Sequence, residues 1–292
     1  MTKRSLNLRK VATIVACLVV TSTMFSGCGK DPDQIDPNNP TTKEAVELKS
    51  PITENTTLKD LGLEVDYFYA GSGNLIVENS ATLTIEPGVC IRFSHTGKRG
   101  ALLIRNGATI KAIGTASKRI QFIGADNSKG SWNGISLETN SDHQFAYCDI
   151  LNAGNGGGST SGLGAVYMSS GAKAGFSYCK FTNGNGNGLN IYDYGGVCQI
   201  TAFDNNVFED FELAPVYLYN SNLKLLEKFD MTSDFTKNKV QYIDTRDFTK
   251  LAENVTLSQT TVPYHFGGPA QTPSFDKYIL TINEGVTIYI SK

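Results

Sequence analysis

Two short patterns recur along the middle of the chain and keep step with one another. The first is an apolar run seen as GISL (134–137), GAVYM (164–168), GLNI (188–191) and PVYL (215–218), with steps of 31, 23 and 27 residues between aligned positions. The second has the form F-x-x-[C/N]-x-[I/F] and lies at 145–150, 176–181 and 203–208, with steps of 31 and 27. Two patterns that move together at this period indicate a solenoid of stacked repeats.

Each repeat contains short alternating apolar runs separated by Gly, Asn and Pro, and long apolar runs of helical period are missing. Strands of three to five residues are predicted at 75–77, 83–85, 89–93, 102–104, 108–110 and 120–123. One coil of a parallel β-helix holds two or three such strands, and about 230 residues give about eight coils. The predicted fold class is therefore all-β, a single-stranded parallel β-helix of about eight coils.

Stacked coils place equivalent residues in ladders along the axis of the solenoid. The alignment predicts three ladders, which consist of Phe145, Phe176 and Phe203, of Ile150, Phe181 and Phe208, and of Cys148, Cys179 and Asn206. Stacked cysteines have parallel Cβ vectors, which a disulfide tolerates only if the backbone distorts. Cys148 and Cys179 are thus predicted to be free, buried thiols, whereas the state of Cys198 stays open. Cys90 alternates with Val89 and Ile91 and is expected to face outward.

One phrase occurs near both ends of the repeat region, as LTIEPGVCIRF (83–93) and as LTINEGVTIYI (280–290). In the first copy, Leu83 and Ile85 are expected to point inward and Pro87-Gly88 to make the corner of a coil. The second copy has Asn283-Glu284-Gly285 in place of the Pro corner, and the last coil is expected to be almost bare. An open last coil is a candidate docking surface for a protein partner.

The phrases LTIEPGVCIRF, GALLIRNGATIKAIGTASKRIQFIG and GSWNGISL resemble right-handed parallel β-helix proteins of bacterial cell surfaces. This is the pectin-lyase-like fold, and the resemblance covers roughly residues 60–292. It implies a right-handed helix. It implies no single activity, because this fold carries lyases, hydrolases, adhesins and proteins without known activity.

The N-terminus has the features of a secretory signal, with a basic start, an apolar run over 11–25 and small residues before Cys28. The stretch FSGC resembles the lipobox of bacterial lipoproteins, which implies lipid attachment to Cys28. The following GKDPD resembles the export signal of surface lipoproteins of Bacteroides-type bacteria. We expect a signal peptide at 1–27, the lipidated Cys28 and a disordered tether at 28–50, and a β-helix domain at 51–292. The implied location is the outer membrane, lipid-anchored, at the cell surface or on the periplasmic face.

Charge and motif content argue against several classes of partner. The net charge is −2 and no basic cluster occurs beyond the signal, so nucleic acid is not an expected partner. The three histidines are far apart in sequence and no HExxH or CxxC motif occurs, so no metal site or cofactor is predicted. Asp31, Asp33 and Asp36 lack the Gly and Glu of a calcium loop and are assigned to the tether.

No catalytic residue is assigned. Polysaccharide lyases of the resembling fold combine a carboxylate calcium cluster with an Arg or Lys base, and its glycosidases use clustered Asp residues. Lys180 occupies the same position as Asp149 on the adjacent coil, either as such a base or, as we favour, in a cross-coil ion pair. The remaining candidates, which we expect mainly in solvated loops, are Asp204, Glu209, Asp210, Glu212 and Arg246, the last of which lies between Asp244 and Asp247.

One face of the predicted stack has more promise as a binding site. The outward positions of the first pattern are Ser136, Tyr167, Asn190 and Tyr217, followed by Glu138, Ser169, Tyr192 and Tyr219, with Asp193 at the edge. Aromatic rings with hydrogen-bonding neighbours suit the faces and hydroxyls of sugars. Tyrosine also simply favours strands, and a loop could cover the face. The predicted ligand-binding residues are Tyr167, Asn190, Tyr192, Tyr217 and Tyr219.

These features lead to three functional hypotheses. The first is a non-enzymatic, membrane-anchored lipoprotein whose β-helix binds a polysaccharide or another surface component. The second is a short polysaccharide lyase or glycosidase. The third is an adhesive or structural spacer that binds protein partners through its C-terminal coil.

Overall fold

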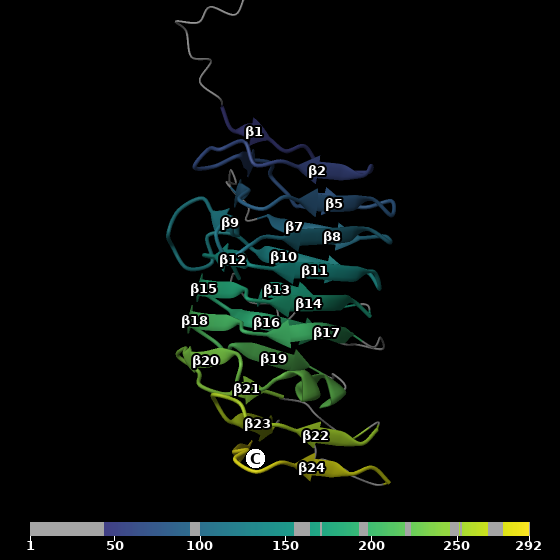
Figure 1. Ribbon diagram of the computed structural model, residues 1–292, viewed down its shortest axis with the longest axis vertical. Helices are drawn as coiled ribbons and strands as arrows, with labels where there is room; N and C mark the ends of the chain where they lie inside the picture. Colours follow the sequence, from purple (N-terminus) through teal and green to yellow (C-terminus); the bar gives the residue numbers. More distant parts are fainter. Residues whose placement is uncertain are drawn as a thin grey trace, which may run out of the picture. The chain divides into compact units, whose positions relative to one another are not determined.

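The computed structural model describes residues 44–93, 100–154, 164–169, 171–192, 198–219, 223–245, 251, 253–267 and 277–291. These residues belong to one compact unit that spans 43–292. They form short parallel strands and a 3-10 helix, η1 (Leu223–Lys228). The strands lie in successive coils from the N-terminal to the C-terminal end (Figure 1). No helix in the described part of the chain is long and apolar enough to cross a membrane.

The longest sheet takes one strand from each successive coil and has nine strands, all paired in parallel. Its strands are β4 (Leu75–Val77), β7 (Ala101–Arg105), β10 (Gly134–Glu138), β13 (Gly164–Met168), β16 (Asn187–Tyr192), β19 (Val216–Tyr219), β21 (Ile243–Asp244), β23 (Tyr264–Gly267) and β25 (Ile288–Ser291). We call it the nine-stranded sheet. Its strand count agrees with the predicted stack of about eight coils.

Two further sheets complete the coils. The eight-stranded sheet consists of β1 (Val46–Glu47), β3 (Tyr67–Tyr69), β6 (Cys90–Phe93), β9 (Ile120–Gly124), β12 (Cys148–Leu151), β15 (Lys180–Gly184), β18 (Val207–Phe211) and β20 (Asp234–Lys237). The six-stranded sheet consists of β2 (Thr56–Leu58), β5 (Thr82–Ile85), β8 (Thr109–Ile113), β11 (Asp142–Ala146), β14 (Lys173–Ser177) and β17 (Gln199–Asp204). Apart from the terminal pairs β1–β3 and β18–β20, neighbours in both sheets are three strands apart in sequence order. This is the topology of a parallel β-helix and confirms the predicted fold class.

The six-stranded sheet ends at β17, and different elements follow it toward the C-terminal end. After β17 the chain forms η1, whose residues Leu223, Leu225 and Leu226 are buried. Beyond η1, β22 (Val255–Leu257) and β24 (Leu280–Ile282) form a separate two-stranded parallel sheet. The helical turn was not expected from the sequence, because six residues are too short for a helical period to be recognised. At the other end, β1 begins at Val46, before the expected domain boundary at 51.

The predicted ladders are present in the interior. Phe145 pairs with Phe176, and Phe176 with Phe203. The rings of Phe145 and Phe176 stack with centroids 5.2 Å apart. In the next ladder, Phe181 and Phe208 stack at 4.3 Å and 7°. Their burial across successive coils makes a continuous apolar core along the axis.

The cysteine ladder is also confirmed, and all four described cysteines are free and buried. Asn206 continues the ladder, because its side-chain oxygen accepts a hydrogen bond from the Cys179 N–H at 2.9 Å. Burial raises the pKa of the Cys148 thiol well above its usual value. Cys90, which is expected to face outward, is nevertheless buried. The Asp66 carboxylate accepts a hydrogen bond from the Cys90 N–H at 2.8 Å. Burial raises the pKa of the Cys90 thiol to about 11.

Candidate functional site

The outward residues of the nine-stranded sheet line up across the coils. Tyr167 pairs with Asn190, Asn190 with Tyr217, and Tyr192 with Tyr219. This register follows from the aligned apolar residues on either side, which must all point into the core. We call Tyr167, Asn190, Tyr192, Tyr217 and Tyr219 the tyrosine cluster.

The shortest of the ring distances described within the tyrosine cluster belongs to a parallel stack. The rings of Tyr192 and Tyr219 have centroids 4.6 Å apart and planes 2° apart. Tyr217 lies 6.5 Å from Tyr219, and Tyr167 lies 6.4 Å from Tyr192 with its plane tilted by 33°. The coil spacing thus holds two phenol rings in line, with a third and fourth ring beside them.

The tyrosine cluster is less open than the sequence suggests. Asn190 is fully buried at 0 % exposure, and Tyr167 is only 9 % exposed. Burial raises the pKa of the Tyr167 hydroxyl, which also bonds Ser169. The half-buried residues Tyr192, Tyr217 and Tyr219 are therefore the ones that a ligand can reach. Asp193, expected at the edge of this face, lies outside the described residues.

A second tyrosine stack, which sequence reasoning missed, lies at a corner of the eight-stranded side. Tyr147 and Tyr178 stack at 4.7 Å and 6°, and the Arg119 guanidinium lies 5.9 Å from the Tyr147 ring centre. Both tyrosines have left-handed backbone angles, with φ of 51° and 56°. The signal was present in the sequence, since a tyrosine precedes the cysteine in both FAYCDI and FSYCKF. We call this pair the corner stack.

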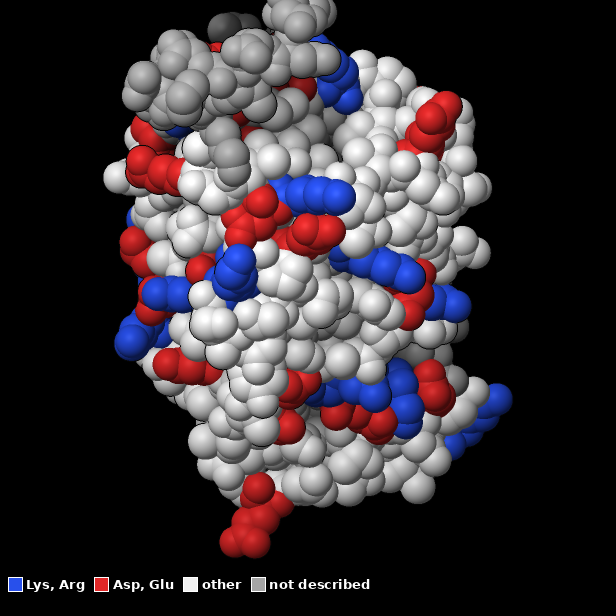
Figure 2. All heavy atoms as spheres, turned by 45° about the horizontal axis from the view of Figure 1, so that its top comes forward, with Lys and Arg blue, Asp and Glu red and all other residues white. Residues whose placement is uncertain are grey.

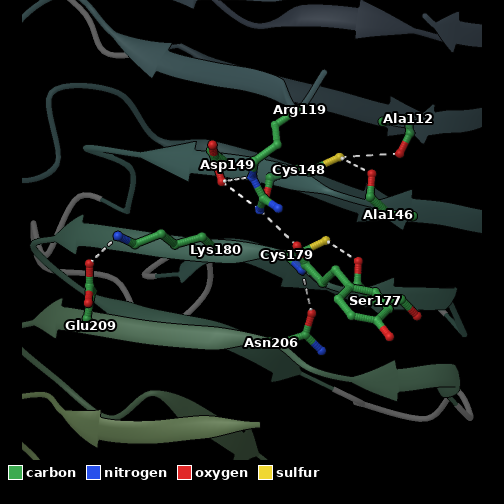
Figure 3. Close-up of polar contacts among 11 residues, drawn as sticks. Ala112, Arg119, Ala146, Cys148, Asp149, Ser177, Cys179, Lys180, Asn206 and Glu209 are labelled. Atoms are coloured by element: carbon green, nitrogen blue, oxygen red, sulfur yellow. Dashed lines mark hydrogen bonds and ion pairs between the residues drawn. The ribbon is translucent and has the colours of Figure 1, made fainter. Parts of the chain in front are cut away.

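The favoured ion pair between Asp149 and Lys180 is wrong. The two residues are neighbours in register, as predicted. Asp149 instead binds Arg119 at 2.7 Å, and Lys180 binds Glu209 at 2.6 Å (Figure 3). Arg119 also donates to the Tyr178 carbonyl at 2.8 Å, so this arginine joins three coils. Lys180 would have to break its ion pair with Glu209 before its amine could act as the base of a lyase.

Of the four acids expected in a solvated loop, three lie in strands instead, and only Glu212 lies outside a strand. Asp204 ends β17, and Glu209 and Asp210 lie within β18. Ion pairs neutralise most of this group: Lys129 binds Asp210 at 2.7 Å and Glu212 at 2.9 Å, and Lys239 binds Glu212 at 2.9 Å.

The two lysines hold the pKa of Glu212 at about 2, because Lys239 and then Lys129 donate hydrogen bonds to its carboxylate. On the face visible in Figure 2, basic and acidic side chains lie beside one another in the same way. Such pairing leaves no cluster of free carboxylates for glycosidase chemistry among these residues. Arg246 and Asp247 lie outside the described residues.

Metal binding finds no support in the described part of the chain, where no group of three or more His, Cys, Asp or Glu could hold an ion. His143 lies in the core, fully buried, and its neighbour in register is Ala174. His265 lies on β23, and His95 is outside the described residues.

A pocket of about 450 Å³ lies between β17 and η1, away from the nine-stranded sheet. Its lining includes Ile200 and Leu225, with Lys224, Lys228 and Glu253 among its polar residues. Lys224 is bound to Glu227 at 2.8 Å. None of the described residues that line the pocket is aromatic, and its features do not define a ligand class.

Comparison with known proteins supports the architecture. Residues 54–161 match a family model described as a pectate-lyase-like beta helix domain. Comparison with curated proteins and with solved structures found no match. The matched segment ends before β13, so the tyrosine cluster lies outside it. In its N-terminal coils the chain is thus similar to pectate-lyase-like β-helix domains.

Proposed function

We propose that the protein is a lipid-anchored lipoprotein of the bacterial outer membrane whose β-helix binds a glycan through the tyrosine cluster. Binding, rather than cleavage of a glycosidic bond, is the proposed role of this cluster. The observation that carries the proposal is the parallel stack of Tyr192 on Tyr219 at 4.6 Å.

The chemistry of the stack suits a sugar. Two parallel rings on neighbouring coils offer apolar surface in line with hydroxyl groups, and sugars combine apolar faces with hydroxyls. Tyr217 adds a third reachable hydroxyl from the register position beside Asn190. Because strand pairing fixes all these positions, little side-chain entropy is lost on binding.

The anchoring part of the proposal rests on the sequence. The basic start, the apolar run and FSGC before the acidic, Pro-rich tether support lipidation of Cys28. Several acyl chains on one residue give stable membrane attachment, since each buried CH₂ contributes ~0.8 kcal/mol. Metabolic labelling with an alkyne fatty acid should mark the full-length chain but not its Cys28→Ser variant. Equal labelling of both would reject the assignment.

Glycan binding is tested with residues 29–292 on a panel of plant, host and bacterial polysaccharides. Tyr192→Ala and Tyr219→Ala should each weaken binding about 2- to 10-fold, because each removes one ring of the stack and such a ring contact contributes ~0.5–1.5 kcal/mol. The matched control is Tyr178→Ala, which removes one ring of the corner stack and should leave binding unchanged. Loss in the control alone would transfer the site to the corner stack.

The lyase or glycosidase alternative is read from the same samples. New reducing ends or unsaturated products would support it, and the carboxylates to change next would be Glu209, Asp210 and Glu212. Their lysine partners favour the binding proposal, because a glycosidase needs one carboxyl that is protonated and one that is free.

A specific observation favours docking of a protein partner as a second function. In the last coil, Ile279, Ile282, Tyr289 and Ile290 are all more than half exposed, at 63, 51, 53 and 81 %. This apolar surface suits an adhesive contact. Ile282→Asp and Ile290→Asp should abolish cell-surface pull-down of a partner while leaving glycan binding intact. Pull-down unaffected by both changes would exclude this coil.

A further inference from the structure

Three side chains near the C-terminal end of the nine-stranded sheet form a connected chain of hydrogen bonds. His265 Nδ1 lies 3.0 Å from Asp244 Oδ1, and His265 Nε2 lies 2.9 Å from Ser291 Oγ. We propose that Ser291, His265 and Asp244 are the nucleophile, base and orienting acid of an ester-hydrolysing site. The hydrolysis itself goes beyond glycan binding and does not depend on it. Only the class of substrate, inferred below, rests on the proposed glycan binding.

The topology explains how residues so far apart in sequence meet. Asp244 on β21 is in register with His265 on β23, and Gly267, two residues further on, is in register with Ser291 on β25. Residues two apart on a strand share a face. The three side chains therefore project from the same outward face of three successive coils. Their strands lie at the end of the stack marked C in Figure 1.

The tautomer of His265 follows from its partners. An ionised Asp244 can only accept a hydrogen bond, so Nδ1 of the neutral imidazole carries the proton. Nε2 then has a lone pair and accepts the hydrogen bond from the Ser291 hydroxyl. This is the arrangement in which histidine takes the serine proton as general base.

Burial changes along the three residues in the order that nucleophilic catalysis requires. Asp244 is 2 % exposed and His265 is 9 % exposed, whereas Ser291 is exposed. The imidazole is held in place by Tyr242, whose ring centroid lies 4.6 Å away. The buried Thr245 donates its hydroxyl to the His265 carbonyl at 2.8 Å, which fixes the backbone.

Gly267 provides the space in which the serine reaches the histidine. A Cβ at this position would lie 2.2 Å from Ser291 Oγ and 3.2 Å from His265 Nε2. Any larger residue would therefore push the hydroxyl away from the base. Strand pairing alone would therefore not bring the two side chains together. The contact between nucleophile and base also requires a glycine at position 267.

The chemistry balances with water as the only co-reactant. Ser291 Oγ attacks the carbonyl carbon of an ester while its proton moves to His265 Nε2. The tetrahedral adduct collapses, the C–O bond to the alcohol breaks, and the alcohol leaves with that proton. Water then attacks the acyl-serine by the same route and releases the carboxylic acid. As the last strand of its sheet, β25 has an edge whose N–H groups can stabilise the oxyanion.

The position of the site points to the substrate class. Asp244 is in register with Tyr217, so the three residues share a sheet face with the tyrosine cluster. A carbohydrate that follows this row of side chains would bring its ester substituents toward Ser291. We infer that the substrate is a carboxylic ester of a carbohydrate.

The test uses the full-length chain in detergent with two probes that need no glycan. A fluorophosphonate should label Ser291, located by peptide mass spectrometry, and p-nitrophenyl acetate should be hydrolysed. Ser291→Ala should abolish both signals. His265→Gln should lower the hydrolysis rate at least about 100-fold, and Asp244→Asn should have an effect of similar size. Gly267→Ala should lower labelling although no reacting group is changed.

The matched control is Ser117→Ala, which removes another exposed serine hydroxyl and should leave both signals unchanged. Circular dichroism of each variant separates loss of chemistry from loss of folding. Absence of fluorophosphonate label on Ser291 in the folded parent chain would overturn the proposal, as would hydrolysis that is unchanged in His265→Gln. Because neither probe contains sugar, these outcomes are independent of the glycan-binding assay.

Discussion

The two copies of the LTI phrase have the same local structure and opposite surroundings. In both, the four-residue turn closes with an N–H to carbonyl distance of 3.4 Å, from Val89 to Glu86 and from Val286 to Asn283. The glycine of each turn has positive φ, 96° in the first copy and 79° in the second. In both cases the turn is of the type that needs Gly at its third position.

Burial separates the copies. Phe93 in the first copy is 2 % exposed, whereas the equivalent Ile290 is 81 % exposed. The first copy lies on β5 and β6, which have a strand on each side, but β24 and β25 each end a sheet. The comparison shows that the phrase itself determines the turn and the strands, and that the neighbouring coils determine whether its side chains are buried.

The largest difference should appear when equivalent apolar residues are truncated. Phe93→Ala should lower the free energy of unfolding by about 3–5 kcal/mol, because the ring stacks on Trp132 at 4.2 Å and leaves a cavity. Ile290→Ala should change it by less than about 0.5 kcal/mol. Urea denaturation of both variants measures the difference. Equal losses would mean that the last coil is covered in solution.

The stability of the coils that have a neighbour on each side should also depend on pH, because His143 lies in one of them. Burial lowers the pKa of this histidine from 6.5 to about 4. The unfolded chain therefore binds a proton that the folded chain rejects, and stability should fall as the pH drops from about 6.5 to about 4. The loss should reach about 3 kcal/mol. Below pH 4 this contribution should stay constant.

Unfolding by urea at several pH values measures the effect of His143. A His143→Leu variant should remove this part of the pH dependence, because it keeps an apolar side chain in the core. A matched His265→Leu variant would show whether the exposed end contributes. If His143→Leu kept the full acid sensitivity, the effect would belong to other groups.

Smaller and equal effects are expected at the two turn glycines. Gly88→Ala and Gly285→Ala should each cost about 1–2 kcal/mol, because both place a side chain at positive φ. Equal values would support the conclusion that the turn is a local property of the phrase. Thermal unfolding of the two variants provides the measurement, and a much smaller cost at Gly285 would show that the last turn is not formed.

The only stabilising change concerns the residue before each glycine. Glu284→Pro gives the second copy the corner of the first and should raise stability by about 0.4–1 kcal/mol, by restricting the unfolded chain. The reciprocal change Pro87→Glu should lower it by a similar amount. Calorimetry of both variants tests the pair. Destabilisation by Glu284→Pro would show that the two turns differ in backbone angles.

Much of the fold could be predicted because a solenoid repeats one set of contacts. The ladders through Phe176 and Phe181 follow from the spacing alone. The partners of the charged residues could not be predicted. Asp149 is in register with Lys180, but its carboxylate pairs with Arg119, which reaches it from the preceding corner. The burial of Cys90 could not be predicted for a related reason. Alternation along a strand gives the direction of a side chain but not which residues cover it.

The site at the C-terminal end was missed although its signal was present. The row that contains Tyr217 continues to Asp244 and His265 with steps of 27 and 21 residues, within or close to the period of the earlier repeats. The apolar flanks that made the earlier rows visible are shorter here, as β21 has only two residues. An alignment based on the apolar residues therefore ends at β19 and does not include Asp244 and His265.

The one-sided pairing of the last coil also bears on how the molecule opens. In a stack where each coil contacts only its neighbours, an end coil can detach at a small fraction of the cost of global unfolding. The backbone amides of β24 and β25 should accordingly exchange with deuterium much sooner than those of β5 and β6. Because Ser291 belongs to that end coil, its hydrogen bond to His265 should form and break with the local detachment of the coil. A ligand that binds across β23 and β25 would favour the state in which this hydrogen bond is formed.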